Sequence, residues 1–493
     1  MAMVRDSRAS AFVLLGSVLC VYALSLRGGY LNWDDPWLVA QNRFFLHPTL
    51  GGLWQIWTDC SATVRYDLGA EYLPVRDTSL WLEAVLHRPN PALSRVIQLS
   101  LYGAALLRLR SFLRTSTGNS QVAEVAIWFF ALHPAHVEVV AWLSARKDVL
   151  ALLFSGAALD LYSRRPRRVA TVVLLCALAS LSKASSIVSP ELLLVGDLML
   201  RRKPNWATIG VSIAVVTAVG VVQLRVGSAL GMLTGFAGGN RTSAFFTEGT
   251  VLLRYLQLSA WPQGLSLIHD MLPEGSWTWH ATLGFGAWVG WLGAALWARQ
   301  RRLVAAWLLF TIPLLPTVNA LIPIQNLLAD RYLCLSLIGP ALLFGELCVN
   351  LRRALRSAVL SCTLLGLGAV SAYRARLFTS SVPVLEEAVL HSPDSRRAAF
   401  QLGKAYEEVG RPDDAIRAYR DTLQRTAGVE EAAIRASIAL TRLEEAQGDR
   451  SGALRELEAA LRRWPTDERL RRRQRRLAPL SETSERDPRD TRP

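Results

Sequence analysis

The chain has 493 residues, of which 51% are hydrophobic and only 19% charged, and its mean hydropathy is +0.23. This composition is too apolar for an ordinary soluble multidomain protein, so we expect a membrane protein. The formal net charge of +15 does not indicate nucleic-acid binding, because the basic residues come in short bursts between apolar runs without a zinc-finger or RNA-binding signature.

Apolar runs that could form membrane helices begin close to the N-terminus. The first covers residues 9–26 and follows Arg5 and Arg8, as in a signal peptide, but no small-residue cleavage pattern follows Leu26. We therefore expect a retained span. Several later runs fall short of the ~20 residues that cross a bilayer, so their ends must extend into flanking residues. The later runs cover residues 93–109, 120–132, 148–162, 169–182, 185–200, 206–224, 282–298, 303–321, 332–347 and 358–372.

Basic residues cluster at every second boundary between these runs. Because Lys and Arg collect on the cytoplasmic side of short loops, the alternation predicts about eleven spans, with the N-terminus in the cytoplasm and the C-terminus outside. This alternation holds only if the apolar residues 251–261 do not cross the membrane, so we expect an interfacial or re-entrant helix there. The clusters are Arg5/Arg8, Arg108/Arg110/Arg114, Arg164/Arg165/Arg167/Arg168, Arg201/Arg202/Lys203, Arg299/Arg301/Arg302 and Arg352/Arg353/Arg356.

The loops without basic clusters would all face the non-cytoplasmic side. The first of them, residues 27–91, is rich in acids and tryptophans and contains the adjacent carboxylates Asp34 and Asp35. Polar groups at membrane depth are costly, so a cluster on one face predicts a functional site. A solvated turn and anchoring of cations at anionic headgroups are the alternatives. The other polar residues expected on this face are Tyr72, Arg76, His133, His136, Glu138, Arg146, Lys147, Lys183, Asp330 and Arg331.

The sequence lacks the motifs of several common enzyme and transporter classes. The sequence has no phosphate-binding glycine loop, no Gly-x-Ser-x-Gly elbow and no HExxH helix, so ATP-driven transport is not expected. Its six cysteines follow neither a disulfide framework nor a metal spacing. His133, His136 and Glu138 could ligate a metal at the outer face, or their polar groups could cap a helix that starts after Pro134.

Beyond Tyr373 the composition changes abruptly from apolar to charged and alanine-rich, which indicates a soluble domain. Residues 374–476 show the helix–turn–helix pattern of tetratricopeptide repeats, whose stacked pairs present a concave surface for extended partners. A generic amphipathic bundle is the alternative. The charged tail, residues 477–493, is expected to be disordered. The repeat positions are Leu402, Gly403, Tyr406, Ala415 and Tyr419, then Leu440, Ala453, Leu457, Ala460 and Pro465, with Leu385, Ala388 and Pro393 in a degenerate leading repeat.

Five motifs occur in a fixed order along the membrane part. They are Trp33-Asp34-Asp35, Tyr72-Leu73-Pro74-Val75, His133-Pro134-Ala135-His136-Val137-Glu138, Arg146-Lys147-Asp148-Val149-Leu150 and Asp330-Arg331-Tyr332-Leu333. This ordered set resembles the transmembrane and tetratricopeptide-repeat-containing O-mannosyltransferases and their bacterial relatives, within the GT-C superfamily of glycosyltransferases. The resemblance covers essentially the whole chain. It implies an all-α fold, with a polytopic membrane domain over residues 1–373, tetratricopeptide repeats on the periplasmic side, and a place in a bacterial inner membrane.

The resemblance also implies an activity, namely inverting transfer of a sugar, expected to be mannose, from a polyprenyl-phosphate donor to an acceptor hydroxyl, expected to be a protein Ser or Thr. Such a transfer needs a carboxylate to take the acceptor proton and cations to hold the departing phosphate. Whether a divalent cation takes part stays open. The implied roles are catalytic base for Asp34 or Asp35, donor-phosphate binding for Arg331, Lys183, Arg146 and Lys147, and substrate orientation for Tyr72, Arg76, His133, His136, Glu138 and Asp330.

The sequence departs from the family pattern at two places. Ala184 stands where the family often has an acid, and Cys334-Leu335-Ser336 replaces an aromatic-proline pattern. Both departures leave room for another lipid-linked hexose or pentose. A non-catalytic membrane-anchored repeat scaffold for envelope proteins is the competing hypothesis, but it has no use for acids, histidines and cations on one membrane face. A transporter would carry charged groups inside its spans.

Overall fold

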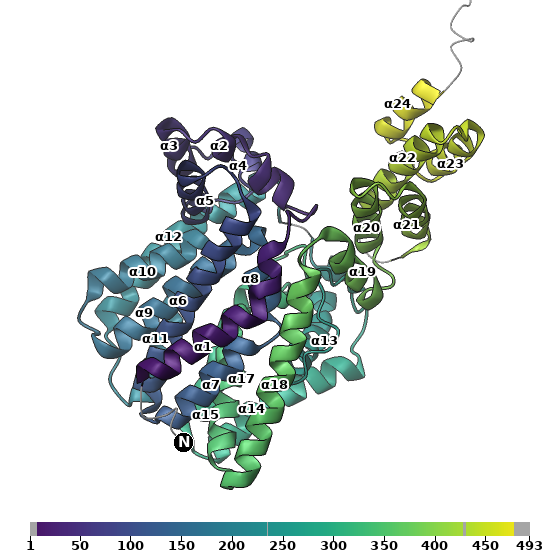
Figure 1. The fold of residues 1–493 in the computed structure, drawn as a ribbon. Coiled ribbons are helices and arrows are strands. Elements are labelled where there is room, and N and C mark those ends of the chain that lie inside the picture. Colours follow the sequence, from purple (N-terminus) through teal and green to yellow (C-terminus); the bar gives the residue numbers. More distant parts are fainter. Residues whose placement is uncertain (1–6, 234, 427–429, 478–493) are drawn as a thin grey trace, which may run out of the picture. The chain divides into compact units, whose positions relative to one another are not determined.

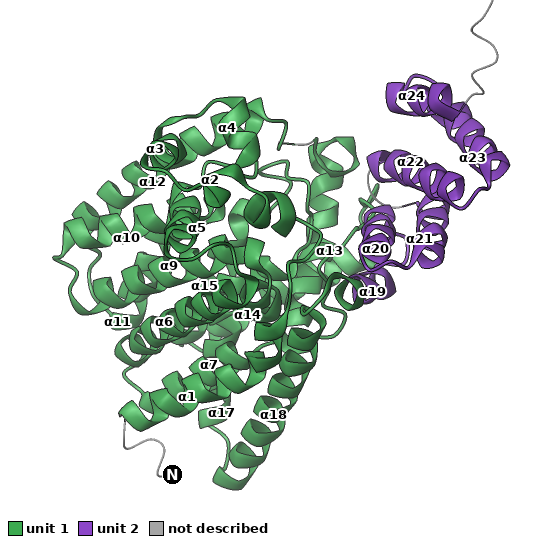
Figure 2. Cartoon of the chain, turned by 45° about the horizontal axis from the view of Figure 1, so that its top comes forward, with its two compact units in different colours: residues 1–384 green, residues 385–493 purple. Residues whose placement is uncertain are grey.

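The computed structural model describes residues 7–233, 235–426 and 430–477, and within these ranges every regular element is a helix. Extended pairing is limited there to two isolated bridges, Leu233 with Ile324 and His269 with Leu328. The predicted all-helical fold class is therefore confirmed. The chain divides into two compact units, residues 1–384 and residues 385–493 (Figure 2).

Unit 1 contains the apolar helices and the proposed outer loops. Helices α1 and α18 are far apart in sequence but pack side by side (Figure 1). The helices of this unit are α1 Ser7–Tyr22, α2 Arg43–Leu46, α3 Leu50–Thr58, α4 Ala62–Asp67, α5 Pro74–Leu86, α6 Pro91–Thr117, α7 Ser120–Leu132, α8 His136–Ala141, α9 Arg146–Arg164, α10 Val169–Ser182, α11 Ser189–Leu200, α12 Trp206–Ala229, α13 Arg241–Ala260, α14 Trp279–Trp297, α15 Arg301–Leu314, α16 Leu333–Ser336, α17 Ile338–Val349 and α18 Arg353–Leu377.

Four helical segments are long and apolar enough to cross a membrane. They are Arg8–Arg27, which contains most of α1, and helices α6, α12 and α18. Residues Asp330–Ser336 and Ile338–Val349 form a bent pair, with an angle of 57° between the two parts, that could supply a fifth span. These segments support an integral membrane protein, whereas the count of eleven spans and their orientation stay predictions.

Local sequence signals set the ends of the longest helix. The side chain of Asn90 accepts hydrogen bonds from the backbone N–H groups of Ala92 and Leu93, and Pro91 occupies the first position of α6. The helix ends at Gly118, whose φ of +60° is left-handed and therefore suits a residue without a Cβ. Asn119 then caps α7 in the same way. One Gly-Asn pair thus joins two antiparallel helices.

The first loop folds into a small subdomain with its own core. Its short helices α2 to α5 gather together in Figure 1, and apolar side chains from all four meet between them. Threonine and serine caps start two of these helices, because Thr49 accepts from Gly52 N and Ser61 accepts from Val64 N. The core residues are Leu38, Val39, Phe44, Phe45, Ile56, Val64, Leu68, Leu80 and Trp81.

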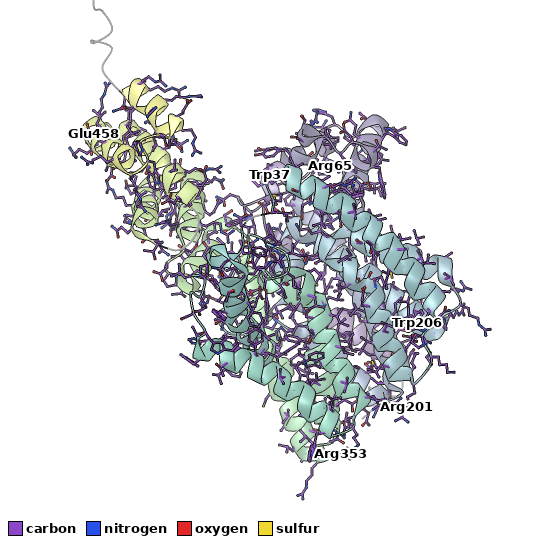
Figure 3. The ribbon with its side chains drawn as sticks, turned by 180° about the vertical axis from the view of Figure 1, so that it is seen from behind. Trp37, Arg65, Arg201, Trp206, Arg353 and Glu458 are labelled. Carbon is purple, nitrogen blue, oxygen red and sulfur yellow. The ribbon has the colours of Figure 1, made fainter. Side chains whose placement is uncertain are left out.

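The two ends of unit 1 carry different residues. Figure 3 shows Arg201 and Arg353, from two of the basic clusters, toward one end of the unit, with Trp37 and Arg65 of the first loop toward the other. The predicted topology requires such a separation, and sidedness itself stays a prediction. Arg5, the first residue of the basic clusters, lies outside the described residues.

Unit 2 consists of paired helices. Gly403 in α20 lies directly against the ring of Tyr419 in α21, so no larger residue fits between these helices. The helix–turn–helix pairs fall where the repeat pattern predicts them, while their identity as tetratricopeptide repeats stays a prediction. The tail predicted to be disordered covers residues 477–493. Its first residue, Leu477, ends helix α24 and is fully buried, whereas residues 478–493 lie outside the described residues. The helices are α19 Ser381–His391, which contains the unit boundary, then α20 Arg396–Glu408, α21 Pro412–Gln424, α22 Glu430–Ala446, α23 Arg450–Arg463 and α24 Glu468–Leu477.

Candidate functional site

Asp35 is a fully buried carboxylate whose oxygens are occupied by the protein itself. One oxygen, Oδ2, accepts a hydrogen bond of 2.9 Å from Leu31 N, and the other, Oδ1, accepts from Ser144 N at 3.0 Å and Ser144 Oγ at 2.6 Å. Hydrogen bonds to a charged acceptor are stronger than neutral ones. Asp35 therefore ties the first loop to the segment that leads into α9.

Asp34, one residue earlier, has different surroundings. Its side chain is half-buried, and its carboxylate makes no hydrogen bond or ion pair within the part of the chain that the structure describes. Burial raises the pKa of Asp34 to about 6, against the opposing effect of the charges on Lys147 and Arg331. Such a carboxylate is mostly ionised at neutral pH and still free to accept a proton.

Buried interactions fix the backbone that presents this turn. The guanidinium of Arg95, on α6, donates to the carbonyl oxygens of Gly28 and Gly29. Asn32 N donates to Ser381 Oγ over 2.9 Å. The turn is thus held from two directions within unit 1, by α6 and by the segment after α18.

Glu71 of the first loop binds two of the predicted site cations, Arg76 of the same loop and Lys147 of α9. Its Oε2 accepts from Lys147 Nζ at 2.7 Å and from Arg76 Nη1 at 3.1 Å, while Arg76 Nε also donates to Asp77 at 2.7 Å. Burial would raise the pKa of Glu71, but Lys147 and Arg76 outweigh it and hold the pKa below its usual value. Glu71 therefore stays ionised near Asp34. It belongs to none of the five sequence motifs.

A small pocket with an empty volume of about 330 Å³ brings two of the predicted cations together. Lys183 forms an ion pair with Asp148, and Arg331 Nη1 lies 2.7 Å from Glu138 Oε1. Both cations approach the ring of Tyr332, each 5.5 Å from its centroid. The lining residues are Asp148, Ala151, Leu152, Lys183, Ser185, Ser186, Pro313, Arg331, Tyr332, Cys334 and Leu335.

Asp330 anchors the chain next to this pocket. Its fully buried carboxylate accepts from His269 Nε2 at 2.8 Å, from Ser266 N at 2.8 Å and from Arg374 Nη1 at 3.3 Å. Three segments distant in sequence thereby meet immediately before Arg331. The sequence motif contained Asp330 but gave no functional indication for His269 or Arg374.

Arg146, predicted to bind the donor phosphate, has its guanidinium engaged inside the protein. It is 1% exposed and donates to Glu83 Oε2, Gln98 Oε1 and Ser94 O, each at 3.0 Å. These contacts join α9 to α5 and α6. The structure therefore does not bring Arg146 to the pocket of Lys183 and Arg331.

Three further residues predicted to orient substrate also lie in structural contacts. His133 and His136 are fully buried, with ring centroids 6.4 Å apart, and His136 Nε2 lies 3.1 Å from Cys334 O. Tyr72 donates from its hydroxyl to Trp57 O at 2.9 Å within the first loop. Across the described residues, no three His, Cys, Asp or Glu side chains gather as a metal site would require.

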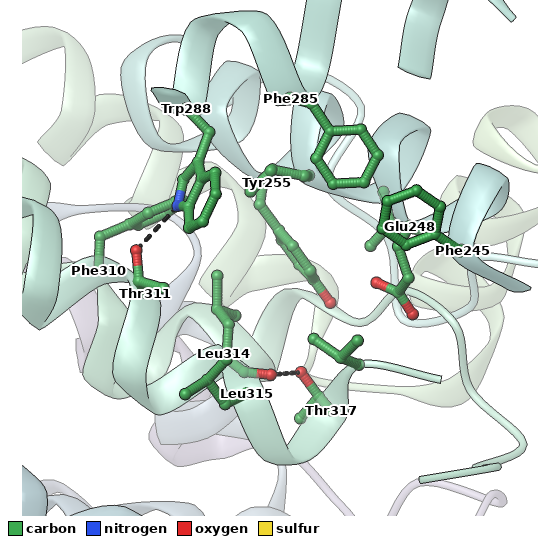
Figure 4. Close-up of a pocket in the computed structure, with 13 residues that line it drawn as sticks. Phe245, Glu248, Tyr255, Phe285, Trp288, Phe310, Thr311, Leu314, Leu315 and Thr317 are labelled. Atoms are coloured by element: carbon green, nitrogen blue, oxygen red, sulfur yellow. Dashed lines mark hydrogen bonds between the residues drawn. The ribbon is translucent and has the colours of Figure 1, made fainter. Parts of the chain in front are cut away.

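A second, larger pocket is almost entirely apolar and has an empty volume of about 670 Å³ (Figure 4). Helices α13, α14 and α15 line it, chiefly with aromatic and leucine side chains. Tyr255, which lines this pocket, also contacts the segment that leads to the smaller pocket: its hydroxyl accepts a hydrogen bond of 3.2 Å from the N–H of Ala329, two residues before Arg331. Glu248 also lines this pocket and accepts from Asn319 N.

Comparison with known proteins gives a distant relationship. No protein-family model matches the chain. A protein O-mannosyl-transferase from Caenorhabditis elegans is 28% identical over 160 residues, which are 31% of this chain. The chain covers 23% of that relative's length. The chain is therefore distantly similar to an O-mannosyltransferase over part of its length, which supports a glycosyltransferase-like function in general.

Proposed function

We propose that the protein is a membrane glycosyltransferase that moves a sugar, expected to be mannose, from a polyprenyl-phosphate donor to an acceptor hydroxyl at the outer membrane face. The observation that carries this proposal is the contrast within the acidic turn. The carboxylate of Asp34 is free within the described residues and lies near the cations Lys147 and Arg331, whereas both carboxylate oxygens of Asp35 accept hydrogen bonds from the protein. The relationship to an O-mannosyl-transferase agrees with this chemistry.

Asp34 acts as the catalytic base. Its carboxylate takes the proton of the acceptor hydroxyl while the acceptor oxygen attacks the anomeric carbon of the sugar. The bond between that carbon and the phosphate oxygen breaks, and the lipid phosphate leaves with the electron pair. Attack from the face opposite the phosphate inverts the anomeric carbon, and general-base assistance of this kind contributes about 10²–10⁴-fold in rate.

Lys183 and Arg331 hold the donor phosphate in the smaller pocket. Each cation already has an acid that orients it, Asp148 for Lys183 and Glu138 for Arg331. Cations fixed before the reaction stabilise the charge that develops on the leaving phosphate at little reorganisation cost. Arginine also suits phosphate because its planar group can donate two parallel hydrogen bonds.

The apolar pocket of α13 to α15 receives the lipid part of the donor. Its lining has the hydrocarbon character that a polyprenyl chain requires, and Tyr255 places it next to the segment that carries Arg331. The helix pairs of unit 2 bind a polypeptide acceptor or partner, which makes the reaction protein O-glycosylation in a bacterial inner membrane. No metal is assigned to the reaction.

Sugar transfer with a panel of donors tests this function. Membranes containing the protein, and matched membranes without it, receive radiolabelled polyprenyl-phosphate mannose, polyprenyl-diphosphate-linked sugar or GDP-mannose together with Ser- and Thr-containing acceptor peptides. We expect protein-dependent labelling of peptide with the polyprenyl-phosphate donor alone. Labelling from GDP-mannose without lipid would contradict the donor class. No labelling from either of the two lipid-linked donors would favour the scaffold hypothesis.

A further inference from the structure

Helix α24, the last helix of unit 2 within the described residues, presents a face of arginines. Its apolar side chains Leu470 and Leu477 are fully buried in a core with residues of α22 and α23. The opposite side of the helix carries four exposed arginines and a single acid, Glu468. The four residues, called here the arginine face, are Arg471, Arg472, Arg475 and Arg476.

We propose that the arginine face binds the headgroups of anionic phospholipids in the membrane that unit 1 spans. This inference does not depend on the proposed sugar transfer. It assigns to α24 a second role besides closing the core of unit 2, namely attachment of this unit to a charged bilayer surface.

The positive charges on the arginine face repel one another. Residues three and four apart on a helix are neighbours, so Arg471 and Arg475, and also Arg472 and Arg476, repel each other and destabilise the isolated helix. Within α24, the acid that offsets this charge is Glu468, which lies 3.2 Å from Arg472 with both side chains highly exposed. An anionic surface relieves this repulsion.

The arginines of α21, of α22 and of the turn before α21 pair with acids of unit 2. Arg411 and Arg417 both pair with Asp414, and Arg435 pairs with Glu431. By contrast, Arg475 and Arg476 have no ion-pair partner among the described residues. The excess of positive charge is greatest in α24, which has six arginines and one acid, compared with four arginines and two acids in α23.

Two observations favour lipid phosphate as the partner. All the basic residues of α24 are arginines, and a guanidinium donates two parallel hydrogen bonds to a phosphate, which an ammonium group does not. The chain also has membrane-spanning segments of its own, the last of which ends at Leu377, so a bilayer is always present at high effective concentration. The arginine face carries no large apolar side chain, so it contacts headgroups and does not insert.

Hydrogen exchange of the full-length protein in nanodiscs tests the proposal. Discs of phosphatidylcholine alone are compared with discs that contain phosphatidylcholine and phosphatidylglycerol in equal amounts. We expect the amides of residues 468–477 to exchange roughly fivefold more slowly, or slower still, in the anionic discs. We expect the difference to vanish in about 1 M NaCl, where the screening length is only about 3 Å. Equal exchange in both discs at low salt would overturn the proposal.

Variants separate the arginine face from unit 2 in general. Replacing its four arginines with glutamine should abolish the difference between discs, whereas replacing them with lysine should keep most of it. A control of equal charge change replaces four ion-paired arginines of α21, α22 and the turn before α21 with glutamine, and it should keep the whole difference. Loss of the difference in the control would show that it depends on the general charge of unit 2, and protection by added poly-glutamate but not by phosphatidylglycerol would assign the face to another partner. Either result would overturn the proposal. The control residues are Arg411, Arg417, Arg435 and Arg442.

Discussion

At the scale of single residues, the adjacent acids Asp34 and Asp35 have different surroundings and therefore different roles. The carboxylate of Asp35 points into the protein and accepts three hydrogen bonds, whereas the carboxylate of Asp34 is half-buried and accepts none among the described residues. The sequence predicted a site at this turn but left the choice between the two acids open. The choice depends on Ser144, which is 109 residues away and belongs to no motif.

Replacing each acid with asparagine should therefore have opposite effects on stability. Asp35→Asn leaves buried N–H and O–H donors with a weaker acceptor and should lower the free energy of unfolding by about 1–3 kcal/mol. Asp34→Asn should leave it unchanged or raised, because burial disfavours the ionised form of Asp34. Thermal unfolding in detergent at neutral pH measures both. A larger loss for Asp34→Asn than for Asp35→Asn would reverse the assignment.

The pH dependence of transfer gives a second residue-scale prediction. The folded pKa of Asp34, about 6, lies above that of a free aspartate. The stability linked to its proton is present at low pH and is lost as the pH rises through about 6, while the ionised base that catalysis needs appears over the same window. The transfer rate should thus rise with pH, with a midpoint near 6.

Asp35→Asn serves as the control for this profile. It should lower the rate through its effect on the turn but keep the rising limb, because Asp34 remains in place. A flat profile in the wild type between pH 5 and 8, or a limb lost only in Asp35→Asn, would show that Asp34 is not the titrating base.

At the scale of elements, close packing of helices depends on single glycines. Helices α13 and α14 meet at Gly249 and Gly284, where a Cβ on Gly284 would overlap the carbonyl oxygen of Gly249. Small residues permit such contacts between helices in membranes. Composition predicted the apolar run of α14, but no single-sequence pattern indicated which of its many glycines touches a neighbour.

A pair of equal substitutions on α14 checks this contact. Gly284→Ala should lower the free energy of unfolding by about 1–3 kcal/mol, because the added methyl group forces the helices apart. Gly290→Ala should be neutral or slightly stabilising, because its added methyl group would meet no other atom within 4 Å and alanine favours helix. Equal unfolding midpoints in detergent would contradict the tight packing of α13 on α14.

Other elements show where prediction from sequence stops. The run at 206–224 corresponds to helix α12, which begins at Trp206. The short helices α2 to α5 were not predicted, because they are too brief to show a helical period and share a core of their own. The hydrogen bond between His269 and Asp330 joins residues that are 61 apart in sequence. Helix and strand propensities carry no information about contacts between such distant residues.

At the scale of the whole molecule, the proposed function requires a membrane with two different sides. Cys60, in the first loop, is exposed and is predicted to face outward, while the cluster Arg201/Arg202/Lys203 is predicted to face the cytoplasm. A membrane-impermeant maleimide should label Cys60 in intact cells. A Lys203→Cys variant without its other exposed cysteines should react only after the membrane is permeabilised. Labelling in the opposite order would invert the topology.

The measurement that tests the central claim most directly is sugar transfer by Asp34→Asn. Protein in nanodiscs receives radiolabelled polyprenyl-phosphate mannose and acceptor peptide. The rate is compared with wild type and with Arg43→Gln, a loop variant that removes an exposed ion pair with Asp67 and a cation–π contact with Phe44. We predict a loss of about 10²-fold or more for Asp34→Asn with an unchanged unfolding midpoint, and near wild-type transfer for Arg43→Gln. Wild-type transfer by Asp34→Asn would contradict the claim that this carboxylate is the base.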